Sequence, residues 1–302
     1  MSTLSEMITE EEYDDGMKGL VLAGGTGKRM WPMTIATSKQ LLPVHNKPLI
    51  FYPISVLMHA DIREIALITT PYDQIFFQKL LGDGSAFGLK ISYLVQENPE
   101  GIAQSFIIAK EFIGKDDVAL ILGDNLFYGS NFLEILSKKI KKKGATIFTY
   151  SVSNPSEYGV LNLDSEDKPT LVEEKPNNPK SNLAITGLYF FDNKVVQYAE
   201  TIKPSKRGEL EITEIMQIYV DNMDLDYVKL PTGTAWLDTG TPNSLSDASQ
   251  FVRVLEDRTG KKIACLEEIS YNKGWITKSE LQIRVKYFGN SSYGKYLESL
   301  EC

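Results

Sequence analysis

Residues 20–34 read LVLAGGTGKRMWPMT, an apolar run that changes abruptly into glycines and cations. The apolar residues 20–23 are typical of the end of a buried strand. Three glycines then fall within residues 24–27, and Lys28 and Arg29 follow them. Glycine lets backbone N–H groups approach a ligand closely, and successive N–H groups can form a concave site for an anion. The stretch therefore predicts a strand that runs into a phosphate-binding loop, although an ordinary strand-to-loop turn uses the same residues.

This stretch matches neither of the two common phosphate motifs. The P-loop pattern needs a glycine five positions before the Gly-Lys pair, where this chain has Leu22, and a Ser or Thr after the lysine, where it has Arg29. The dinucleotide-binding pattern, counted from Gly25 and Gly27, needs a glycine where this chain has Met30. The second mismatch argues against a nicotinamide-dependent dehydrogenase, which would share an open parallel sheet.

Outward from this loop, apolar strands alternate with helical patterns. Strands are predicted at 18–22, 64–70, 89–96, 117–125 and 145–152, with helices between them at 47–60, 72–82, 100–114 and 130–144. We expect Pro48 in the first turn of the first of these helices. The alternation indicates an α/β protein with a Rossmann-like mixed, mostly parallel sheet flanked by helices.

After residue 155 the pattern changes. Residues 159–176 alternate apolar and polar positions around a polar turn, which predicts an antiparallel hairpin. A strand at 182–192, helices at 192–202 and 209–222, and a strand at 225–231 follow, and helical patterns dominate from Pro242 onward. We expect three regions, which are a disordered acidic tail at 1–16, an α/β domain with a smaller β lobe at 17–241, and a helical C-terminal extension at 242–302.

The composition argues against several classes of protein. The 302 residues carry a net charge of −8 with a pI near 5.0, whereas a nucleic-acid surface needs a basic face. No apolar run approaches the roughly 20 residues of a membrane span, and no signal peptide is expected. Cys265 and Cys302 are the only cysteines, which fits a reducing cytoplasm. His45, expected in a turn, and His59, expected on a packed helix, are the only histidines, so a histidine-based nucleophile relay is not expected.

Four candidate site segments lie where predicted strands end. The glycine loop, Gln96, Asp124 and Asp238 each follow a strand directly, and ligands of open parallel sheets bind beyond the carboxyl ends of the strands. A lone acid at such a position is usually a turn former. Two acids beside a loop of glycines and cations instead fit a Mg²⁺ site, because this ion prefers hard oxygen ligands and keeps waters and phosphates in its shell.

Two further segments carry charge next to predicted strands. EEKP ends the hairpin with Glu174 and Lys175. Neighbouring strand residues face opposite ways, so at most one of them would point into a pocket unless the backbone twists there. A solvated hairpin edge is the alternative. SKQLLP places Lys39 and Gln40 before an apolar turn, where a surface loop is the alternative.

Eight motifs occur in the same order as in one known family. They read LAGGTGKR, SKQLLP, LGDNLFYG, EYGV, EEKP, ITGLYFFD, KPSKRGELEITE and AWLDTGT. Through them the chain, from Met17 almost to its end, closely resembles the bacterial sugar nucleotidyltransferases. SKQLLP and LGDNLFYG together resemble the glucose-1-phosphate thymidylyltransferase branch rather than the uridylyltransferases or the acetylglucosamine branch.

The resemblance implies that dTTP and α-D-glucose 1-phosphate give dTDP-glucose and pyrophosphate, with Mg²⁺ as cofactor, in a homotetramer built as a dimer of dimers. It implies nucleotide-binding roles for Leu22, Gly24, Gly25, Thr26, Gly27, Arg29, Lys39, Gln40, Gln96 and Gly101. It implies sugar-phosphate-binding roles for Asn125, Tyr158, Gly159, Glu174, Lys175, Ile185 and Arg207. Arg29, Lys39 and Lys175 would be catalytic, and Asp124 and Asp238 would bind the metal.

The implied chemistry agrees with the shortage of histidine. The nucleophile would be a phosphate oxygen of the sugar 1-phosphate, which is already an anion at neutral pH because its second pKa is about 6. No general base is then needed. The main requirement is that cations and Mg²⁺ cancel the repulsion between two polyanions and hold them in line.

The chain departs from the family pattern at three positions. Lys28 and Met30 stand where the family usually has Thr and Leu, and Ser130 stands where many relatives have His, near a second, regulatory nucleotide site. Three alternatives stay open, which are uridylyl transfer, a hexose other than glucose, and a catalytically dead homologue that only binds sugar nucleotides. Loss of Arg29, Lys175 or a metal carboxylate would favour the last, and all of these residues are present.

Overall fold

The computed structural model describes residues 16–138 and 143–300. Residues 1–15 of the expected acidic tail lie outside this part of the chain, as do residues 139–142 of the helix expected at 130–144. No helix within the described residues is both long and apolar enough to cross a membrane.

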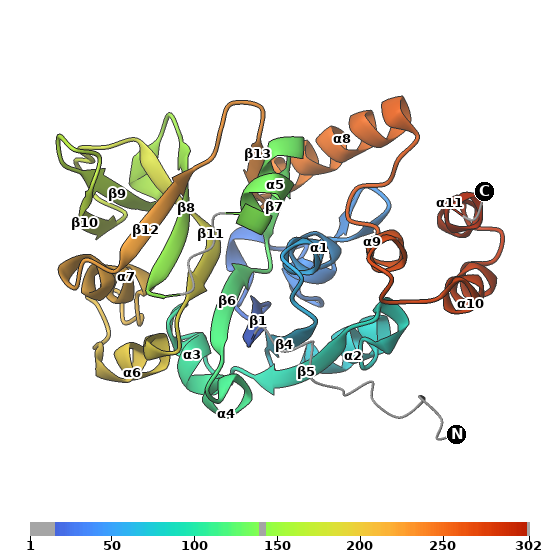
Figure 1. Ribbon diagram of the computed structural model, residues 1–302, viewed down its shortest axis with the longest axis horizontal. Helices are drawn as coiled ribbons and strands as arrows, with labels where there is room; N and C mark the ends of the chain where they lie inside the picture. Colours follow the sequence, from blue (N-terminus) through green and yellow to red (C-terminus); the bar gives the residue numbers. More distant parts are fainter. Residues whose placement is uncertain (1–15, 139–142, 301–302) are drawn as a thin grey trace, which may run out of the picture.

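Four parallel strands form the centre of the main sheet (Figure 1). β1 (Met17–Leu22) lies between β4 (Glu64–Thr69) and β6 (Asp117–Leu122), and β5 (Lys90–Val95) extends the sheet beyond β4. The last residue of β1 is in register with Ile68 of β4 and with the last residue of β6, so the carboxyl ends of these strands meet at one edge. The predicted α/β fold with its central parallel strands is confirmed.

The sheet continues beyond β6 as a lobe of mixed strand direction. β11 (Leu183–Phe191) runs antiparallel to β6 and also pairs with β8 (Ala145–Ser151) and β9 (Gly159–Leu163). β10 (Pro169–Glu174) pairs antiparallel with β9, which confirms the predicted hairpin, and β12 (Leu225–Lys229) lies parallel to β8. Within the described residues, nine strands belong to this sheet.

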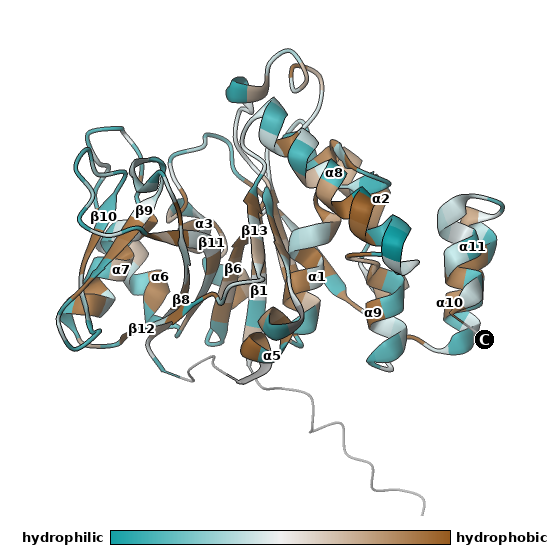
Figure 2. Ribbon diagram, turned by 90° about the horizontal axis from the view of Figure 1, so that it is seen from above, coloured by the Kyte–Doolittle hydropathy of each residue, from teal (hydrophilic) through white to brown (hydrophobic). Residues whose placement is uncertain are grey.

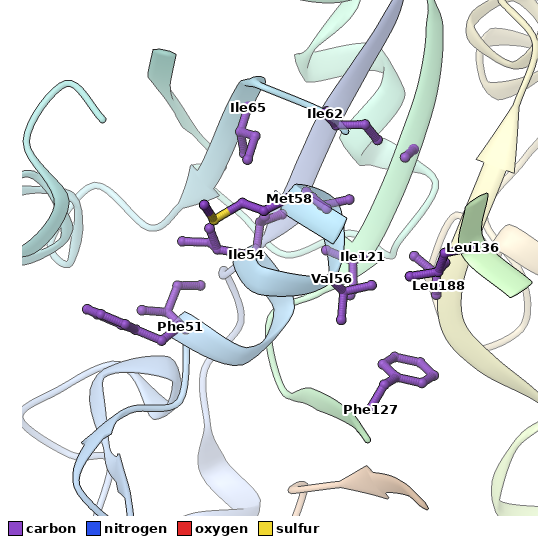
Figure 3. Packing of buried hydrophobic residues seen from close by; sticks show 14 of the residues in the cluster. Phe51, Ile54, Val56, Met58, Ile62, Ile65, Ile121, Phe127, Leu136 and Leu188 are labelled. Atoms are coloured by element: carbon purple, nitrogen blue, oxygen red, sulfur yellow. The ribbon is translucent and has the colours of Figure 1, made fainter. Parts of the chain in front are cut away.

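Two apolar layers cover the faces of the sheet. Val21 of β1 points into the layer beneath α1 (Phe51–His59), whereas Leu20 points into the opposite layer, because neighbouring strand residues face opposite ways. Figure 3 shows the side chains of α1 packed among those of the strands, and Figure 2 shows the apolar strands between the helices. The α1 side also holds α2 (Gln74–Leu81) and α5 (Ser130–Lys138), and the other side holds α3 (Gln104–Ile108), α4 (Lys110–Ile113), α6 (Lys194–Thr201) and α7 (Ile212–Asp221).

The helix expected at 47–60 starts only at Phe51. Pro48 lies in β3 (Lys47–Pro48), which pairs with β2 (Pro43–Val44), so its expected place in the first helical turn is wrong. The backbone N–H groups that follow Pro48 donate to carbonyls before β2, and they close a hairpin instead of a helical turn.

The helix expected at 100–114 is divided into α3 and α4. Ala109 separates them, with φ −90° and ψ 7°. These angles lie near the bridge region rather than in the α-helical well, so the helical hydrogen-bond pattern restarts at Lys110.

An antiparallel ribbon that the sequence pattern does not predict joins two distant segments. β7 (Asn125–Tyr128) begins just after β6 leaves the sheet, and it pairs with β13 (Ala235–Asp238). The register places Asp238 opposite Asn125. The ribbon therefore brings Asp238 beside Asp124.

Helices make up most of the described chain after this ribbon. They are α8 (Pro242–Thr259), α9 (Leu266–Asn272), α10 (Lys278–Phe288) and α11 (Ser292–Ser299). α9 packs against α1, and α10 packs against α11 at the edge of the molecule (Figure 1). The division of the chain into a main domain and a helical extension stays a prediction.

A buried carboxylate ties α8 to the hairpin of β2 and β3. Glu256 accepts hydrogen bonds from the Lys47 ammonium (2.9 Å) and from the Ile263 backbone N–H (2.9 Å), and only 6% of its surface is exposed. Burial alone would raise the pKa of Glu256, but Lys47 and the hydrogen bonds hold it below its ordinary value. Since Lys39 and Gln40 shortly precede this hairpin, the C-terminal helices support the segment that carries them.

Both histidines have the structural places expected from the sequence. His45 is a turn residue between β2 and β3 with φ 56°, and His59 is the last residue of the packed helix α1. Burial lowers the pKa of His59 to about 4, so its imidazole is neutral at pH 7.

Candidate active site

A cavity of about 610 Å³ lies at the carboxyl ends of β1 and β6. Nine of the predicted site residues line it, namely Leu22, Gly24, Gly25, Thr26, Gly27, Arg29, Lys39, Gln40 and Asp124. Gln96 and Gly101 belong to the loop after β5, whose Pro99 and Ile102 also line the cavity. The structure therefore brings the predicted nucleotide-binding residues together at one edge of the sheet, as the rule for parallel strands anticipates.

The glycine loop turns sharply after β1. Gly25 has φ 101° and Gly27 has φ 59°, values that favour glycine. Met30 is 1% exposed and anchors the end of the loop, whereas its neighbours Lys28 and Arg29 are exposed and line the cavity. The loop thus holds two cations at the mouth of the cavity on a buried support.

Asp124 and Asp238 lie beside two cations. The Lys39 ammonium forms an ion pair with Asp124. A Cβ atom on Gly240 would lie 3.2 Å from Asp238 Oδ1 and 3.7 Å from Arg29 Nη1, so this carboxylate and guanidinium border the same small space. The ribbon of β7 and β13 positions both acids.

The two carboxylates differ in their titration. Burial and the charge of Asp124 raise the pKa of Asp238 to about 6. Burial also acts to raise the pKa of Asp124, but the adjacent Lys39 ammonium lowers it below its ordinary value. Ionising Asp238 therefore costs more than the neighbouring cations recover, mainly because its carboxylate is buried.

The carboxylate pair fits a hard divalent cation that takes other ligands from outside the protein. Among residues 16–138 and 143–300, no three His, Cys, Asp or Glu side chains are grouped as ligands of one metal ion. Mg²⁺ characteristically uses one or two protein carboxylates together with waters and substrate phosphates. Asp124 and Asp238 would supply the protein ligands of such a shell, next to a loop suited to phosphates.

Gln96 and Gly101 lie where the glycine loop meets the loop after β5. A Cβ atom on Gly24 would collide with Gln96 Oε1, so the loop backbone directly touches this amide. Gln96 is 3% exposed, and its Nε2 donates to Gln104 Oε1 (2.7 Å). Gly101 has φ 111°, and a Cβ atom there would collide with the backbone of Leu210. Only glycine fits at position 101, and the segment around Leu210 braces this loop.

Glu174 and Lys175 point to the same side because the backbone twists at the end of β10. Lys175 has φ 43°, outside the extended range of a strand. Its backbone N–H donates to the Tyr158 carbonyl (3.0 Å), and its ammonium lies 3.9 Å from Glu174 Oε1. This twist allows Glu174 and Lys175, although they are neighbours in the chain, to face the same side.

Arg207 joins this pair from another segment of the chain. Its guanidinium donates to Glu174 Oε1 (3.1 Å) and lies 3.5 Å from Glu211 Oε1. Burial and the charge of Glu211 raise the pKa of Glu174, although Lys175 and Arg207 act in the opposite direction. Glu174 is therefore a part-buried acceptor beside two cations.

Gly159, Ile185 and Tyr158 complete the surroundings of Glu174. A Cβ atom on Gly159 would lie 3.5 Å from Glu174 Oε2 and 3.8 Å from Ile185 Cδ1. Burial raises the pKa of Tyr158, and the charge of Asp238 raises it further. Neither the predicted sugar-phosphate-binding residues nor Asp238 line the 610 Å³ cavity. Except for Asn125, the predicted sugar-phosphate-binding residues cluster around Glu174, near enough to Asp238 for its charge to act on Tyr158.

Asn125 is positioned to hold Asp124 rather than to face solvent. It is 2% exposed, and its Oδ1 accepts hydrogen bonds from Trp236 Nε1 (2.6 Å) and from the Gly187 backbone N–H (3.0 Å). Its Nδ2 donates to Asp124 Oδ1 (3.0 Å). Its amide therefore orients Asp124, and most of its hydrogen-bonding capacity is used within the protein.

Among the site residues that sequence reasoning missed are Trp236, Thr239 and Tyr72. Trp236 binds Asn125 and packs on Tyr158 with ring centroids 5.2 Å apart. Thr239 donates its hydroxyl (2.8 Å) and its backbone N–H (3.1 Å) to the Asp124 carbonyl. Tyr72, which is 67% exposed, lines the cavity just after β4, where the strand-end rule could have found it.

Comparisons with known proteins bear on the family of the chain. The nucleotidyl transferase family model matches residues 18–254. The chain is 50% identical over 282 residues to a glucose-1-phosphate thymidylyltransferase of Neisseria gonorrhoeae. These 282 residues cover 93% of this chain and 98% of that protein. It is 51% identical over 284 residues to a glucose-1-phosphate thymidylyltransferase of Mycolicibacterium smegmatis, covering 94% of this chain and 99% of that protein.

Two solved structures share the fold. A crystal structure from Bacillus anthracis, described as a glucose-1-phosphate thymidylyltransferase in complex with sucrose, has a TM-score of 0.72 and 40% identity, covering 78% of this chain and 95% of that one. A UDP-glucose pyrophosphorylase complexed with UDP-glucose has a TM-score of 0.71 over 79% of this chain and 99% of that one. At 22% identity the second likeness shows the fold alone.

Proposed function

We propose a function on the premise that this chain belongs to the nucleotidyl transferase family, and within it to the glucose-1-phosphate thymidylyltransferases. The chain converts dTTP and α-D-glucose 1-phosphate to dTDP-glucose and pyrophosphate. The observation that carries this function is the pair of carboxylates, of which Asp124 lines the cavity with the glycine loop and Asp238 lies near Arg29 and close enough to Tyr158 to raise its pKa. Such an arrangement suits a reaction between two phosphate-bearing substrates.

The nucleotide occupies the 610 Å³ cavity in this proposal. Backbone N–H groups of residues 24–27 and the Arg29 guanidinium bind the triphosphate, because glycine backbone and cations suit a polyanion. Gln96 and the backbone at Gly101 hold the base edge. Lys39 is kept in place by Asp124 and reaches the phosphates as they enter.

The sugar 1-phosphate occupies the second cluster. Glu174 accepts hydrogen bonds from sugar hydroxyls, and Ile185 and Gly159 shape the space around it. Lys175 neutralises the sugar phosphate, whose oxygen attacks the α-phosphorus of dTTP. Arg207, held by Glu174, lies near this phosphate. The residues act by positioning and by charge, and no general base is required.

We assign Mg²⁺ to Asp124 and Asp238. The two neighbouring carboxylates with their hard oxygen donors, and the raised pKa of the buried Asp238, support this assignment. When bound, the ion neutralises charge on the phosphates and favours departure of pyrophosphate. The remaining steps depend on the loop backbone, Arg29 and Lys175, which bind and orient the two substrates.

One panel of assays tests this function. Pyrophosphate release is measured for several nucleoside triphosphates against several sugar 1-phosphates, with and without Mg²⁺. We expect the highest kcat/KM for dTTP with glucose 1-phosphate, by about tenfold or more over UTP, since small apolar differences give discrimination of that order. Preference for UTP or for another hexose would identify one of the alternative transferases, and no release from any pair would identify a homologue that only binds.

We further propose that the protein is a homotetramer, as a dimer of dimers. Large apolar side chains on the C-terminal helices support an interface there, because Val254 is 49%, Ile283 64% and Tyr287 73% exposed. Light scattering at micromolar concentration is expected to give about four times the chain mass of 33.9 kDa. A monomer mass would contradict this assembly.

We propose a cytoplasmic location for the enzyme. The thiol of Cys265 supports it, since this cysteine is free. A thiol of this kind fits a reducing compartment. Fractionation of cells that produce the chain would check the location.

A further inference from the structure

Large apolar side chains flank the mouth of the nucleotide cavity. Of the thirteen large apolar or aromatic side chains that are exposed in residues 16–138 and 143–300, six lie there, each between 42% and 67% exposed. Ile35 and Tyr72 line the cavity, and the other four are close to them in the chain. We call this set the apolar rim, and its members are Trp31, Met33, Ile35, Tyr72, Ile75 and Phe76. Scattered exposed apolar residues are ordinary, but such a concentration is typical of a binding surface.

Supported backbone carries both halves of the rim. In the first half, the buried Thr34 donates its hydroxyl to the Gly27 carbonyl (2.7 Å). In the second half, the Thr70 hydroxyl donates to Asp73 Oδ2 (2.7 Å), and the Asp73 backbone N–H donates back to Thr70 Oγ1 (3.1 Å). The buried ring of Phe77 fixes the start of α2 in the core. The rim side chains are therefore exposed from a well-anchored backbone.

Two cations adjoin the rim. Lys28 and Arg29 are exposed and line the same cavity as Ile35 and Tyr72. They precede Trp31 in the chain by only two or three positions. A partner that covers this whole surface must therefore combine apolar side chains with negative charge.

Residues 1–15 have this combination. They read MSTLSEMITEEEYDD, with six Asp or Glu residues and no Lys or Arg. Since the whole chain has a net charge of −8, these residues hold most of it, and the rest of the chain is nearly neutral. Leu4, Met7 and Ile8 add apolar side chains ahead of the acidic run at 10–15.

The segment is also long enough to reach the rim. The described chain starts at Gly16, next to the amino end of β1, whereas the cavity lies beyond the carboxyl end of that strand. The six residues of β1 span about 20 Å, and fifteen extended residues span up to about 50 Å. A tether of this kind gives an effective concentration of about 1 mM, so weak contacts are sufficient for binding.

We propose that residues 1–15 bind across the apolar rim and oppose the entry of dTTP into the cavity. This inference rests on the proposed function. The acidic run pairs with Lys28 and Arg29, and the apolar residues of the segment cover the rim. The segment and the nucleotide then exclude each other, because both need the mouth of the cavity. An anionic membrane is a poorer partner, since the nearly neutral remainder of the chain gives it no general attraction.

The first test neutralises the segment within the full chain. In the neutral-segment variant, Gln replaces each Glu and Asn replaces each Asp of residues 1–15. We expect the KM of dTTP to fall about three- to fivefold, because a segment bound in most molecules leaves only a fraction of them open to the nucleotide. The kcat and the KM of glucose 1-phosphate should stay within about twofold of wild type. Raised salt should narrow the difference in the KM of dTTP.

The second test changes the rim. The paired substitutions Ile75→Ser and Phe76→Ser should lower the KM of dTTP by a similar factor. Combined with the neutral-segment variant they should lower it no further, since both changes remove one contact. Met223→Ser is the control, because Met223 is an exposed apolar residue of the turn before β12, outside the cavity lining, and it should change no KM.

The third test measures binding directly. A synthetic peptide of residues 1–15, added to the neutral-segment variant, should raise the KM of dTTP and shift tryptophan emission to shorter wavelength. The shift should be absent when that variant also carries Trp31→Phe, because Trp31 is the tryptophan of the rim. A peptide with Ser in place of Leu4, Met7 and Ile8 should bind more weakly.

Other results would overturn the inference. An unchanged KM of dTTP in the neutral-segment variant does so, and so does a KM that rises on substitution of the rim, which would mean that the rim binds the nucleotide itself. If light scattering shows a smaller assembly for the rim variant alone, a second copy of the chain covers the rim instead. Binding of the wild type to phosphatidylglycerol vesicles that the rim variant loses would assign the rim to a membrane.

Failure of the proposed function can be told apart from failure of this inference. If the wild-type chain releases no pyrophosphate from dTTP, the proposed function fails. The emission titration needs no turnover, so it still decides whether the segment binds. A shift that depends on Trp31 supports the contact, and its absence refutes it.

Discussion

Replacing Lys175 with alanine is expected to lower kcat about a hundredfold while leaving the binding of dTTP nearly unchanged. Lys175 is the cation of the second cluster that the twist at φ 43° turns to the side of Glu174, where the sugar phosphate is proposed to bind. Removing a cation that stabilises charge in a transition state typically costs about 3 kcal/mol, which corresponds to roughly this factor in rate. Steady-state kinetics for both substrates, together with calorimetry of dTTP binding, measure the two effects separately.

Lys180→Ala is the matched control for this experiment. Lys180 is an exposed lysine of the segment that follows β10, and it lies outside both site clusters. Its loss should leave kcat and both KM values unchanged. If Lys175→Ala keeps near wild-type turnover, the sugar phosphate is neutralised elsewhere and the proposed arrangement of the second cluster is wrong.

Replacing Asp238 with asparagine is expected to reduce turnover about a hundredfold at low Mg²⁺, with partial recovery as Mg²⁺ is raised. The amide keeps the shape of the side chain and removes one of the two negative charges that we assign to the metal. Activity of the wild type should also be lost with EDTA. Turnover measured across a Mg²⁺ titration tests both statements, and activity indifferent to EDTA would contradict them.

The same substitution should stabilise the protein in the absence of metal. The pKa of Asp238 in the folded chain is about 6, above its ordinary value of 3.8. The protonated carboxyl therefore contributes stability that is fully present below about pH 3.8 and is lost as the pH rises through about 6. Above pH 6 the ionised Asp238 faces Asp124 at a cost that asparagine removes.

Thermal unfolding without metal measures the expected gain in stability. At pH 7.5 we expect a higher Tm for Asp238→Asn than for wild type, and a smaller difference at low pH. Asp247→Asn is the control, because Asp247 is an exposed residue of α8 outside the cavity and should change neither Tm nor turnover. A lower Tm for Asp238→Asn would mean that its carboxylate has a stabilising contact beyond the cations described.

The main sheet could be predicted because its signals are local. Short apolar strands separated by amphipathic helices specify alternation, and alternation specifies parallel neighbours. The errors arose where tertiary contacts override local preference. Pro48 suits a first helical turn, yet the chain there is used to close the hairpin that Glu256 holds through Lys47. The sequence around Pro48 carries no sign of a partner so far along the chain.

The site could be predicted only in part, for a similar reason. The rule for strand ends identifies the glycine loop, Gln96 and Asp124, since each follows a strand of the parallel core. It cannot anticipate the twist at Lys175, because a left-handed backbone at a lysine is set by surrounding contacts rather than by its own preference. Nor does it assign Trp236, whose part in orienting Asn125 depends on the pairing of β7 with β13.

The pairing of β7 with β13 also determines when during synthesis the protein can become active. A ribosome-bound chain that ends before Ala235 already contains β5, β4, β1 and β6, so it can begin to assemble the parallel core and the glycine loop. It has no strand to place opposite β7 and no Asp238 to set beside Asp124. Nascent chains and fragments truncated at this point would therefore have the nucleotide cavity only in part, and they would be inactive until the chain has emerged past Asp238 and the ribbon has closed.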